Sequence, residues 1–347
     1  MNTEWQQFLT QQGASLPSHE QPSVTEHPQQ LVTGENMLCD LSHIGLISIS
    51  GDDAQQFLHA QFTNDVNQVS ASKSQLNAYC SAKGRVLANF RLFMRDGTYY
   101  LAIPQDILGT VLNRLKMFVL RSQVVLNDAS DELIRIGVAG QESTDFLHTL
   151  FSQLPESIND VVQQNSITLI RIHGSTARYE IYGQITDVIP LWKTLAAQLP
   201  VGSPQDWQRM DIAAGIPSIT ASLSDAYVPQ MLNLDVIDAV NFKKGCYPGQ
   251  EVVARTQYLG KLKRRLFRAH IETCINLPPG TSIFASNEAE QVVGKVINAA
   301  CYDCHTEFLA VIQIDSAIPA TLTLESATGP QVTILELPYS IGDNSAK

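Results

Sequence analysis

The spacing of apolar residues predicts mixed strands and helices in the first part of the chain. The stretch IGLISIS, which starts at Ile44, is typical of a buried strand, and the following DDAQQFLHAQF has the helical period behind an acidic N-cap. NAYCSAKGRVLANFRLFMRDGTYYLAIP predicts strands with a tight turn at Asp96-Gly97. Residues 104–120 predict an amphipathic helix. Its apolar face comprises Ile107, Leu108, Val111, Leu112, Leu115 and Phe118.

A second mixed unit begins near Asp131. LIRIGVAG predicts a strand, QESTDFLHTLF a helix, SITLIRI and ARYEIYG two strands, and DVIPLWKTLAAQL a helix that ends before Pro200. From about Lys261 the helical period disappears. VVGKVINAA, EFLAVIQI, ATLTLES and QVTILEL then predict successive short strands, which are typical of a small β-barrel or sandwich.

The first 35 or so residues are rich in Gln, Pro and Ser. Only Trp5, Phe8 and Leu9 stand at helical spacing there, so we expect a frayed arm without chemistry. The chain of 347 residues is too long for one core, because single cores stop growing at roughly 250–300 residues. We therefore expect several domains.

Composition narrows the class of protein. Apolar residues make up 44% and charged residues 16%, no apolar run approaches the roughly 20 residues that span a bilayer, and the N-terminus lacks the features of a secretory signal. We therefore expect a cytoplasmic protein without a membrane partner. Six cysteines in so long a chain favour reduced thiols over a disulfide framework.

The charge balance is uneven along the chain. The net charge of −11 argues against broad binding to nucleic acid, yet 8 of the 23 basic residues lie between Asn241 and Arg268. This segment is either a basic site on an acidic body or an ordinary solvated surface. It begins with NFKKGCYPGQEVVART, in which Tyr247-Pro248-Gly249-Gln250 has the signature of a type II turn.

Cys246 directly precedes that turn, so we expect it at a sharp, accessible bend. Lys243 and Lys244 lie two and three residues before it, and positive charge near a thiol favours the thiolate, which is the nucleophilic and metal-binding form. The alternative is a small cysteine packed under the turn.

The stretch FKKGCYPGQEVVAR closely resembles the K-G-C-[aromatic]-x-G-Q-E signature of the YgfZ family, folate-binding relatives of the glycine-cleavage T-protein. ISGDDAQQFLHAQFTNDV, AKGRVLANFRLF, DWQRMDIAAGIPSI and ELPYS resemble further family segments, from about Ile44 to Ser340. The resemblance implies an α+β fold, a three-domain ring of two mixed α+β domains and a small C-terminal β-barrel, with a central channel for tetrahydrofolate or a derivative. The implied parts are a flexible arm at 1–35, a discontinuous folate-binding domain at 36–130 plus 203–260, a second α+β domain at 131–202, and the barrel at 261–347.

The resemblance also implies a role: maintenance of iron–sulfur enzymes such as tRNA methylthiotransferases, and through them tRNA modification. Cys246 corresponds to the family's required cysteine. The rest of the signature corresponds to Lys244, Gly245, Tyr247, Gly249, Gln250 and Glu251. The candidate folate contacts are Trp207, Ile44, Arg255 and Asn89. Trp207 corresponds to a tryptophan that the family uses against folate, although a domain-packing aromatic is the alternative.

Three positions depart from the family pattern. Ile44 stands where some relatives have a second folate-facing tryptophan, and Ala213 stands where many have a glutamate. The T-protein's acidic hairpin positions are replaced by Ala88 and Asn89, which cannot take up a proton at neutral pH, so we expect no aminomethyltransferase activity. Two alternatives to the accessory role remain: a folate-dependent one-carbon transferase, and a direct tRNA-binding module that uses the basic residues of 261–268.

Cys301-Tyr-Asp-Cys304-His305 fits a haem-attachment pattern and also half of a zinc site. Haem attachment needs an exported chain and structural zinc needs four ligands, so we expect a hairpin loop here and no metal site. An iron–sulfur cluster held by this chain alone would need four thiolates, whereas Cys246 is alone in its motif. We therefore expect Cys246 to act as a redox or transfer thiol, or as an extra ligand for a partner's cluster.

Overall fold

The computed structural model describes residues 2–14, 35–285, 291–317, 321–326 and 328–341. Within it the chain forms two compact units, each assembled from segments that are distant in sequence. Unit 1 comprises Met1–Gln55, Asn67–Gln75 and Arg91–Trp207, and unit 2 comprises Gln56–Val66, Leu76–Phe90 and Gln208–Lys347. The four-part division implied by the family resemblance stays a prediction.

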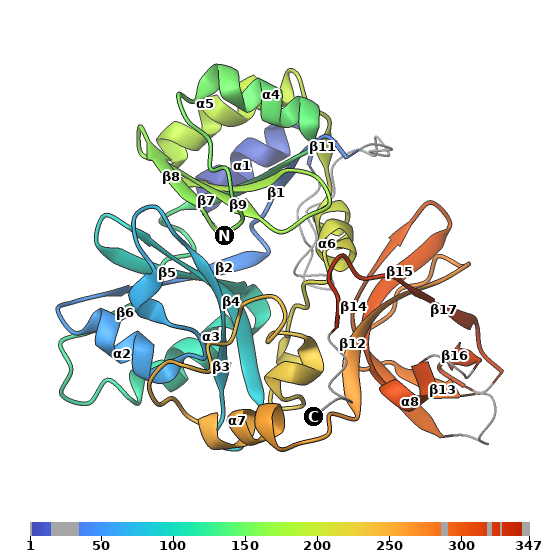
Figure 1. Ribbon diagram of the computed structural model, residues 1–347. Helices are drawn as coiled ribbons and strands as arrows, with labels where there is room; N and C mark the ends of the chain where they lie inside the picture. The colour runs from blue at the N-terminus through green and yellow to red at the C-terminus, as the bar shows by residue number, and fades with distance from the viewer. Residues whose placement is uncertain (1, 15–34, 286–290, 318–320, 327, 342–347) are drawn as a thin grey trace. The chain divides into compact units, whose positions relative to one another are not determined.

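Unit 1 contains a six-stranded sheet with the order β11-β1-β7-β10-β9-β8. Its strands are β1 (Met37–Asp40), β7 (Ile134–Ala139), β8 (Val161–Gln164), β9 (Ile167–Ile172), β10 (Arg178–Gly183) and β11 (Val201–Gly202). Helices α1 (Thr3–Gln11), α4 (Gln141–Leu150) and α5 (Ile185–Ala196) lie over one face of this sheet (Figure 1), and they share one apolar core with it. The strands and helices predicted after Asp131 are confirmed.

Helix α1 corrects the expectation of a frayed N-terminal arm. Asn2 caps it by accepting hydrogen bonds from two first-turn N–H groups. Trp5 is fully buried, its ring meets Trp192 of α5 edge to face, and its Nε1 donates to Asp40 Oδ1 over 2.9 Å. The expectation was wrong for residues 2–14 because three apolar side chains are enough to fix a short helix when the unit supplies a pocket for them. Residues 15–34 of the predicted arm lie outside the described residues.

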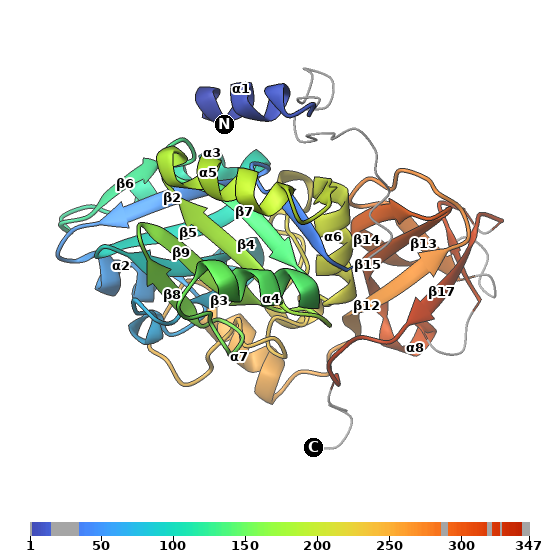
Figure 2. The same ribbon diagram turned by 90° about the horizontal axis from the view of Figure 1, so that it is seen from above.

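A second sheet in unit 1 is built around β2 (Ile44–Ser50), which pairs with β5 (Thr98–Pro104) and with β6 (Val125–Asp128). Residues 91–95 of β4 (Val86–Arg95) pair with β5 across the predicted hairpin turn. Helix α3 (Gln105–Lys116) buries the predicted apolar face against these strands, except for Phe118. The helix ends at Lys116, so Phe118 falls outside its period and is 41% exposed, which corrects its assignment to that face. In the view from above, α4 and α5 lie in front of the strands of the six-stranded sheet (Figure 2).

Unit 2 begins with most of α2 (Ala54–Gln61), the strand β3 (Gln75–Cys80) and the first half of β4. It continues with the end of α6 (Pro204–Ala213) and a long segment of little regular structure. The shorter elements are the 3₁₀ helices η2 (Ala221–Leu223) and η3 (Pro229–Leu232) and the helix α7 (Gln250–Tyr258). A further 3₁₀ helix, η1 (Val66–Gln68), begins in unit 2, and its other two residues belong to unit 1. The irregular segment is firmly packed, because Ile219, Leu232 and Ile237 share a buried core with β3 and with barrel residues.

The C-terminal part of unit 2 is a closed six-stranded barrel with the order β12-β15-β14-β13-β16-β17, as predicted (Figure 1). Its elements are β12 (Arg264–Ile271), β13 (Ser282–Ala285), β14 (Val292–Tyr302), β15 (His305–Gln313), the short helix α8 (Ile314–Ala317), β16 (Leu322–Leu324) and β17 (Gln331–Leu335). Cys301 to His305 form the hairpin between β14 and β15, also as predicted, with Asp303 and Cys304 at positive φ in the turn. The fold is therefore α+β with a C-terminal barrel.

The barrel also corrects the expectation that the cysteines are all reduced thiols. Cys274, just beyond β12, and Cys301, on β14, are joined by a disulfide with their Cα atoms 5.3 Å apart. This pair could not be predicted from the sequence, because the two residues are 27 positions apart and meet only when the barrel closes. Cys39, Cys80, Cys246 and Cys304 are not part of this disulfide.

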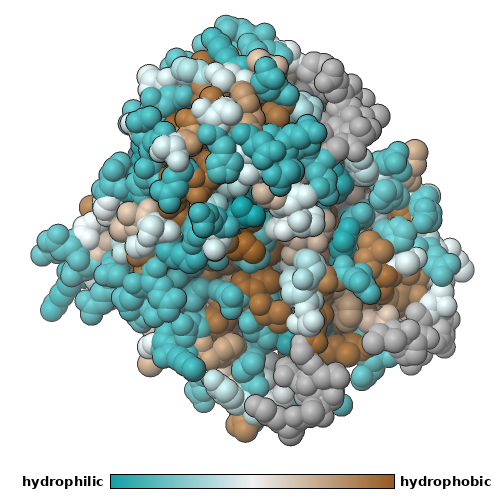
Figure 3. Space-filling model, turned by 45° about the horizontal axis from the view of Figure 1, so that its top comes forward, coloured by the Kyte–Doolittle hydropathy of each residue, from teal (hydrophilic) through white to brown (hydrophobic). Residues whose placement is uncertain are grey.

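The face shown in Figure 3 is largely hydrophilic, with apolar side chains gathered in smaller patches. Within the described residues, no helix combines the length and the apolar character that crossing a membrane requires.

Candidate functional site

The predicted turn after Cys246 is present in unit 2. Gly249 has φ 79° and ψ 5°, and the N–H of Gln250 donates to the carbonyl of Tyr247 over 3.2 Å, which is the geometry of a type II turn. Gly249 also directly precedes α7 and forms its N-cap. The signature therefore joins a loop that carries Cys246 to a helix of nine residues.

Glycine is required at position 249 for two reasons. Its positive φ disfavours any side chain, and a Cβ here would lie 2.3 Å from Ser81 O and 2.5 Å from Gly84 Cα. The turn after Cys246 is thus seated directly on the backbone of the β3–β4 connection. This contact fixes where Cys246 lies relative to the strands of unit 2.

Lys244 does not face solvent as the basic sequence implies. Its side chain is 9% exposed, and its Nζ donates to the carbonyl of Phe62 over 2.6 Å and to that of His59, at the C-terminal end of α2. Burial lowers the pKa of Lys244 to about 8, although Asp65 and Cys246 oppose the shift. Lys244 is therefore mainly an anchor for the loop, and its charge is also felt at Cys246.

Tyr247 is the second anchor of the loop. It is 7% exposed, and Lys244 Nζ lies 5.3 Å from its ring centroid. Burial raises the pKa of the Tyr247 hydroxyl, so the phenol stays protonated at neutral pH. The ring fills space beneath the loop rather than presenting itself to a ligand.

Cys246 is exposed between these two buried anchors. The alternative of a cysteine packed under the turn is therefore wrong. Asn241 holds the start of the loop, because its Oδ1 accepts hydrogen bonds from the N–H groups of Lys243 and Lys244 over 2.8 and 3.1 Å. The arrangement presents one accessible thiol on a fixed backbone.

The remaining signature residues lie on the first turns of α7. Gln250 is half-buried, whereas Glu251 and Arg255 are exposed. This stretch is helical, but among the described residues Glu251 and Arg255 form no ion pair with each other. Their spacing permits a pair, yet solvent competes with it at an exposed position.

The basic segment divides into structural and exposed residues. Arg265 is buried and makes a bidentate pair with Asp235 at 2.6 and 3.0 Å. Two nitrogens of Arg268 donate to one oxygen of Glu307, Oε2, over 2.8 and 3.2 Å. The exposed basic residues of the segment are Lys243, Arg255, Lys261, Lys263 and Arg264. The sequence alone did not reveal these acidic partners, since each is 30 or more positions from the arginine that it binds.

Asn89, at the T-protein's acidic position, is fully engaged within unit 2. Its Nδ2 donates to the carbonyl of Pro217 over 2.7 Å, and its Oδ1 accepts from the N–H of Ile219 over 2.9 Å. Both functions of the amide thus bind the backbone of one segment, and Asn89 is 8% exposed. Ala88 is fully buried. Asn89 consequently holds the chain together here, and neither residue supplies a titratable group.

Trp207, the candidate stacking residue, is 1% exposed within unit 1. The guanidinium of Arg178 lies 4.3 Å from its ring centroid, and a Cβ at Gly137 would lie 2.5 Å from the indole. The ring is therefore covered by protein on the sides that these two residues occupy. This environment is the one expected of the domain-packing alternative.

Ile44 and Ala213, the two other positions that differ from the family pattern, are less tightly packed. Ile44 is half-buried at the start of β2, and Ala213 is half-buried at the end of α6. Just after Ala213, the hydroxyl of Tyr339 donates to the carbonyl of Gly215 over 2.7 Å. The C-terminal ELPYS stretch thus docks on the segment before the signature, a role that its resemblance to the family did not specify.

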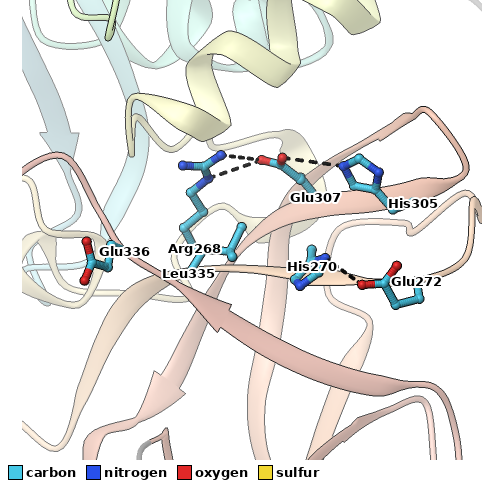
Figure 4. Close-up of a pocket in the computed structure, with 7 residues that line it drawn as sticks. All are labelled: Arg268, His270, Glu272, His305, Glu307, Leu335 and Glu336. Carbon is cyan, nitrogen blue, oxygen red and sulfur yellow. Dashed lines mark hydrogen bonds and ion pairs between the residues drawn. The ribbon is translucent and has the colours of Figure 1, made fainter.

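A separate pocket of about 500 Å³ opens on the barrel. It is lined by Arg268, His270, Glu272, His305, Glu307, Leu335 and Glu336. Figure 4 shows Glu307 between Arg268 and His305, whose Nε2 is 3.6 Å from Glu307 Oε1. Three of the lining residues are glutamates and one is an arginine, which gives the pocket an acidic character. Sequence reasoning did not find this pocket, since its charges come from three separate strands or strand ends.

No group of three or more His, Cys, Asp or Glu side chains within the described ranges has the geometry to hold a metal ion.

Comparisons with known proteins identify the relatives of this chain. The profile of the GCVT N-terminal domain family matches residues 6–202, more than half of the chain. The chain is 34% identical over 332 residues to the tRNA-modifying protein YgfZ of Colwellia psychrerythraea (strain 34H), covering 93% of this chain and 98% of that protein. It is 29% identical over 309 residues to the tRNA-modifying protein YgfZ of Yersinia pestis (strain Pestoides F), covering 88% and 93%.

Among solved structures, the glycine cleavage system aminomethyltransferase T from Bartonella henselae matches with a TM-score of 0.75 over 97% of each chain. At 13% identity this likeness shows the fold alone. The sequence relatives are much closer, and they match nearly the whole chain. The chain therefore belongs to the YgfZ family and shares the fold of the glycine-cleavage T-protein.

Proposed function

We propose that this protein is a cytoplasmic, folate-binding accessory protein that supports the synthesis or repair of iron–sulfur clusters and thereby tRNA modification, with Cys246 as its reactive thiol. The observation that carries the proposal is the exposed Cys246 on a loop held by buried Lys244 and Tyr247. The names of the relatives support the connection with tRNA modification.

A thiol on a fixed loop suits transfer chemistry better than storage of a cluster. Of the other cysteines outside the disulfide, Cys39 and Cys80 are buried and Cys304 is located on the barrel hairpin. Cys246 thus offers one thiolate to a partner, which would serve as a redox or transfer thiol or as an additional ligand of the partner's cluster. Iron–sulfur enzymes such as tRNA methylthiotransferases are the proposed partners.

The test of this role is replacement of Cys246 by serine, with Cys304→Ser as the matched control because Cys304 is the other exposed free thiol. In cells that depend on this protein, we expect Cys246→Ser to lower the methylthio content of tRNA and the activity of an iron–sulfur enzyme. Cys304→Ser should leave both near wild type. Equal tRNA modification in the two variants, at equal protein levels, would remove Cys246 from the proposal.

The candidate folate contacts fit the cofactor only in part. Arg178 covers the Trp207 ring, and the amide of Asn89 already donates to the carbonyl of Pro217 and accepts from the N–H of Ile219, so both side chains are engaged in contacts within the protein. Ile44 and the exposed Arg255 retain accessible surface, and Arg255 has the charge to hold an anionic glutamate tail. Stacking on Trp207 requires the Arg178 guanidinium to leave the ring.

Anaerobic calorimetric titration with tetrahydrofolate tests the cofactor. Saturable micromolar binding that survives Trp207→Phe but is lost in Trp207→Ala would support stacking at this position, because phenylalanine keeps an aromatic face. Binding unchanged in both variants would assign Trp207 to packing, and no binding to the wild type would remove folate from the proposal. Melting curves of each variant separate loss of the site from loss of the fold.

Two alternatives are less well supported. For one-carbon transfer of the T-protein type, the amide of Asn89 offers no base, so we expect no turnover of T-protein substrates. For direct tRNA binding, Arg265 and Arg268 are paired with acidic residues, so fewer basic side chains are available for phosphate groups than the count in the sequence suggests. A steep fall in tRNA affinity with salt would restore this alternative, and a flat response would exclude it.

A further inference from the structure

Half of the chain's six cysteines gather at one end of the barrel. Cys274 lies just beyond β12, Cys301 lies near the end of β14, and Cys304 occupies the turn between β14 and β15. Cys274 and Cys301 are bonded, with a Cα separation of 5.3 Å that is usual for disulfides. This cluster has no part in the Cys246 loop or in the candidate folate contacts.

Hydrogen bonds hold the two bonded cysteines near each other independently of the disulfide. Thr306 is the strand partner of Cys301 and is fully buried. Its hydroxyl donates to the carbonyl of Thr273 over 2.8 Å and accepts from the N–H of Ile275 over 3.0 Å. Both neighbours of Cys274 are thus fixed to the strand position opposite Cys301. If the bond is reduced, the two thiols stay in place and can re-form it.

The disulfide is open to attack from solvent on one side. Cys274 is exposed whereas Cys301 is half-buried, so an external thiolate reaches the sulfur of Cys274 and Cys301 is the leaving group. Cys304 is a further exposed thiol three residues after Cys301. By contrast, Cys39 and Cys80 are no more than 1% exposed and cannot take part without unfolding.

The same chain segments form the walls of the acidic pocket. His270 and Glu272 precede Cys274, and His305 and Glu307 follow Cys301 (Figure 4). The disulfide therefore ties together two wall segments of one pocket. Its reduction would leave β12 and β15 paired through their ladder, and the hydrogen bonds of Thr306 would keep Thr273 and Ile275 in place.

We propose that Cys274 and Cys301 form a thiol–disulfide exchange site whose substrate is a small-molecule thiol of the glutathione class. The first thiolate attacks Cys274 Sγ, forming a mixed disulfide, and the bond to Cys301 breaks with Cys301 leaving as a thiolate that takes up a proton. A second thiolate attacks the small-molecule sulfur of that mixed disulfide and releases the Cys274 thiolate, which is also protonated. The protein disulfide is thereby reduced to two thiols, and two small-molecule thiols are oxidised to their disulfide.

The experiment is a redox titration of the full-length protein in buffers of stepped reduced-to-oxidised glutathione ratio, quenched by alkylation and read by peptide mass spectrometry. The background variant is Cys246→Ser with Cys304→Ser, which leaves the pair intact and removes the other two exposed thiols. We expect one two-electron transition between the bonded and the dithiol forms of Cys274 and Cys301, in folded protein. The Cys246→Ser change also makes the outcome independent of the function proposed above.

The companion variant is Thr306→Val, which keeps the shape of the side chain but removes the hydroxyl that holds residues 273–275. We expect its transition to shift toward the dithiol form by about tenfold in the equilibrium constant, the effect of one lost buried hydrogen bond. A pair that stays bonded at every ratio would be a structural disulfide and would overturn the proposal. A pair that never bonds would overturn it too, as would a transition that Thr306→Val leaves unmoved.

Discussion

Replacement of Gly249 by alanine tests whether the close contact between the signature turn and the β3–β4 connection fixes the Cys246 loop. The added Cβ would lie 2.3 Å from Ser81 O and 2.5 Å from both N and Cα of Gly84. All three atoms belong to the backbone, so no change of rotamer relieves the contact. Either the turn must move away from the β3–β4 connection, or that connection must move.

The magnitude follows from two contributions. A residue with a Cβ in the left-handed region costs about 1–2 kcal/mol, and overpacking against a fixed backbone adds about 1–3 kcal/mol. We therefore expect Gly249→Ala to lower the free energy of unfolding of unit 2 by ~3 kcal/mol. For a unit of this size such a loss lowers Tm by roughly 6–12 °C, which thermal unfolding followed by circular dichroism resolves.

Gly245→Ala is the matched control, because it adds the same methyl group to the same loop. Its Cβ would have one neighbour, His59 Nε2, at 3.5 Å, an ordinary contact, and Gly245 is not at positive φ. We expect a change within about 0.5 kcal/mol, as for most surface substitutions. Equal Tm values for Gly249→Ala and wild type, or equal losses in both variants, would refute the reasoning.

Three further predictions follow from the described contacts. Burial lowers the pKa of Lys244 from 10.5 in the unfolded chain to about 8 in the folded protein. Between these two pH values the unfolded chain binds more protons than the folded protein, so the free energy of unfolding should rise with pH. Urea unfolding at several pH values should show this rise for the wild type and not for Lys244→Met. Asn89→Asp removes the donor to Pro217 and sets a carboxylate against its carbonyl, so it should destabilise by about 2–3 kcal/mol, and a gain in Tm would contradict this. Trp5→Ala removes a fully buried indole and should cost about 3–5 kcal/mol in chemical denaturation, whereas an unchanged midpoint would mean that α1 does not belong to the core.

The sequence was informative wherever the determining physics is local. The strand at Ile44–Ser50 and the helix at Gln105–Lys116 followed from the period of their apolar residues, because burial alternates with the same period as the backbone. The turn at Pro248-Gly249 followed from the restricted φ values of its own two residues. Exposure of the cysteine next to that turn was a consequence of the same local geometry.

Pairings between distant segments were not visible in the sequence. Nothing near Asn89 indicates that its amide binds the segment at Pro217, and nothing near Trp207 indicates that Arg178 covers the ring. The charge of Lys244 suggested a solvated residue, whereas two carbonyls at the end of α2 draw it inside. Each of these side chains has a partner that only the tertiary fold supplies, so residue type alone could not separate a ligand contact from a structural one.

The interleaving of the two units along the chain sets an order for their completion during synthesis. Unit 1 has all of its segments once Trp207 has left the ribosome, but Gln56–Val66 and Leu76–Phe90 belong to unit 2 and need partners made afterwards. At about 5–20 residues per second these two segments wait on the order of 10 s for the rest of unit 2. During that time the two segments, which carry Phe62 and Phe90 with their ring centroids 4.6 Å apart, lack the rest of unit 2. The nascent chain is thus most exposed to aggregation, and most in need of a chaperone, in its first quarter rather than at its growing end.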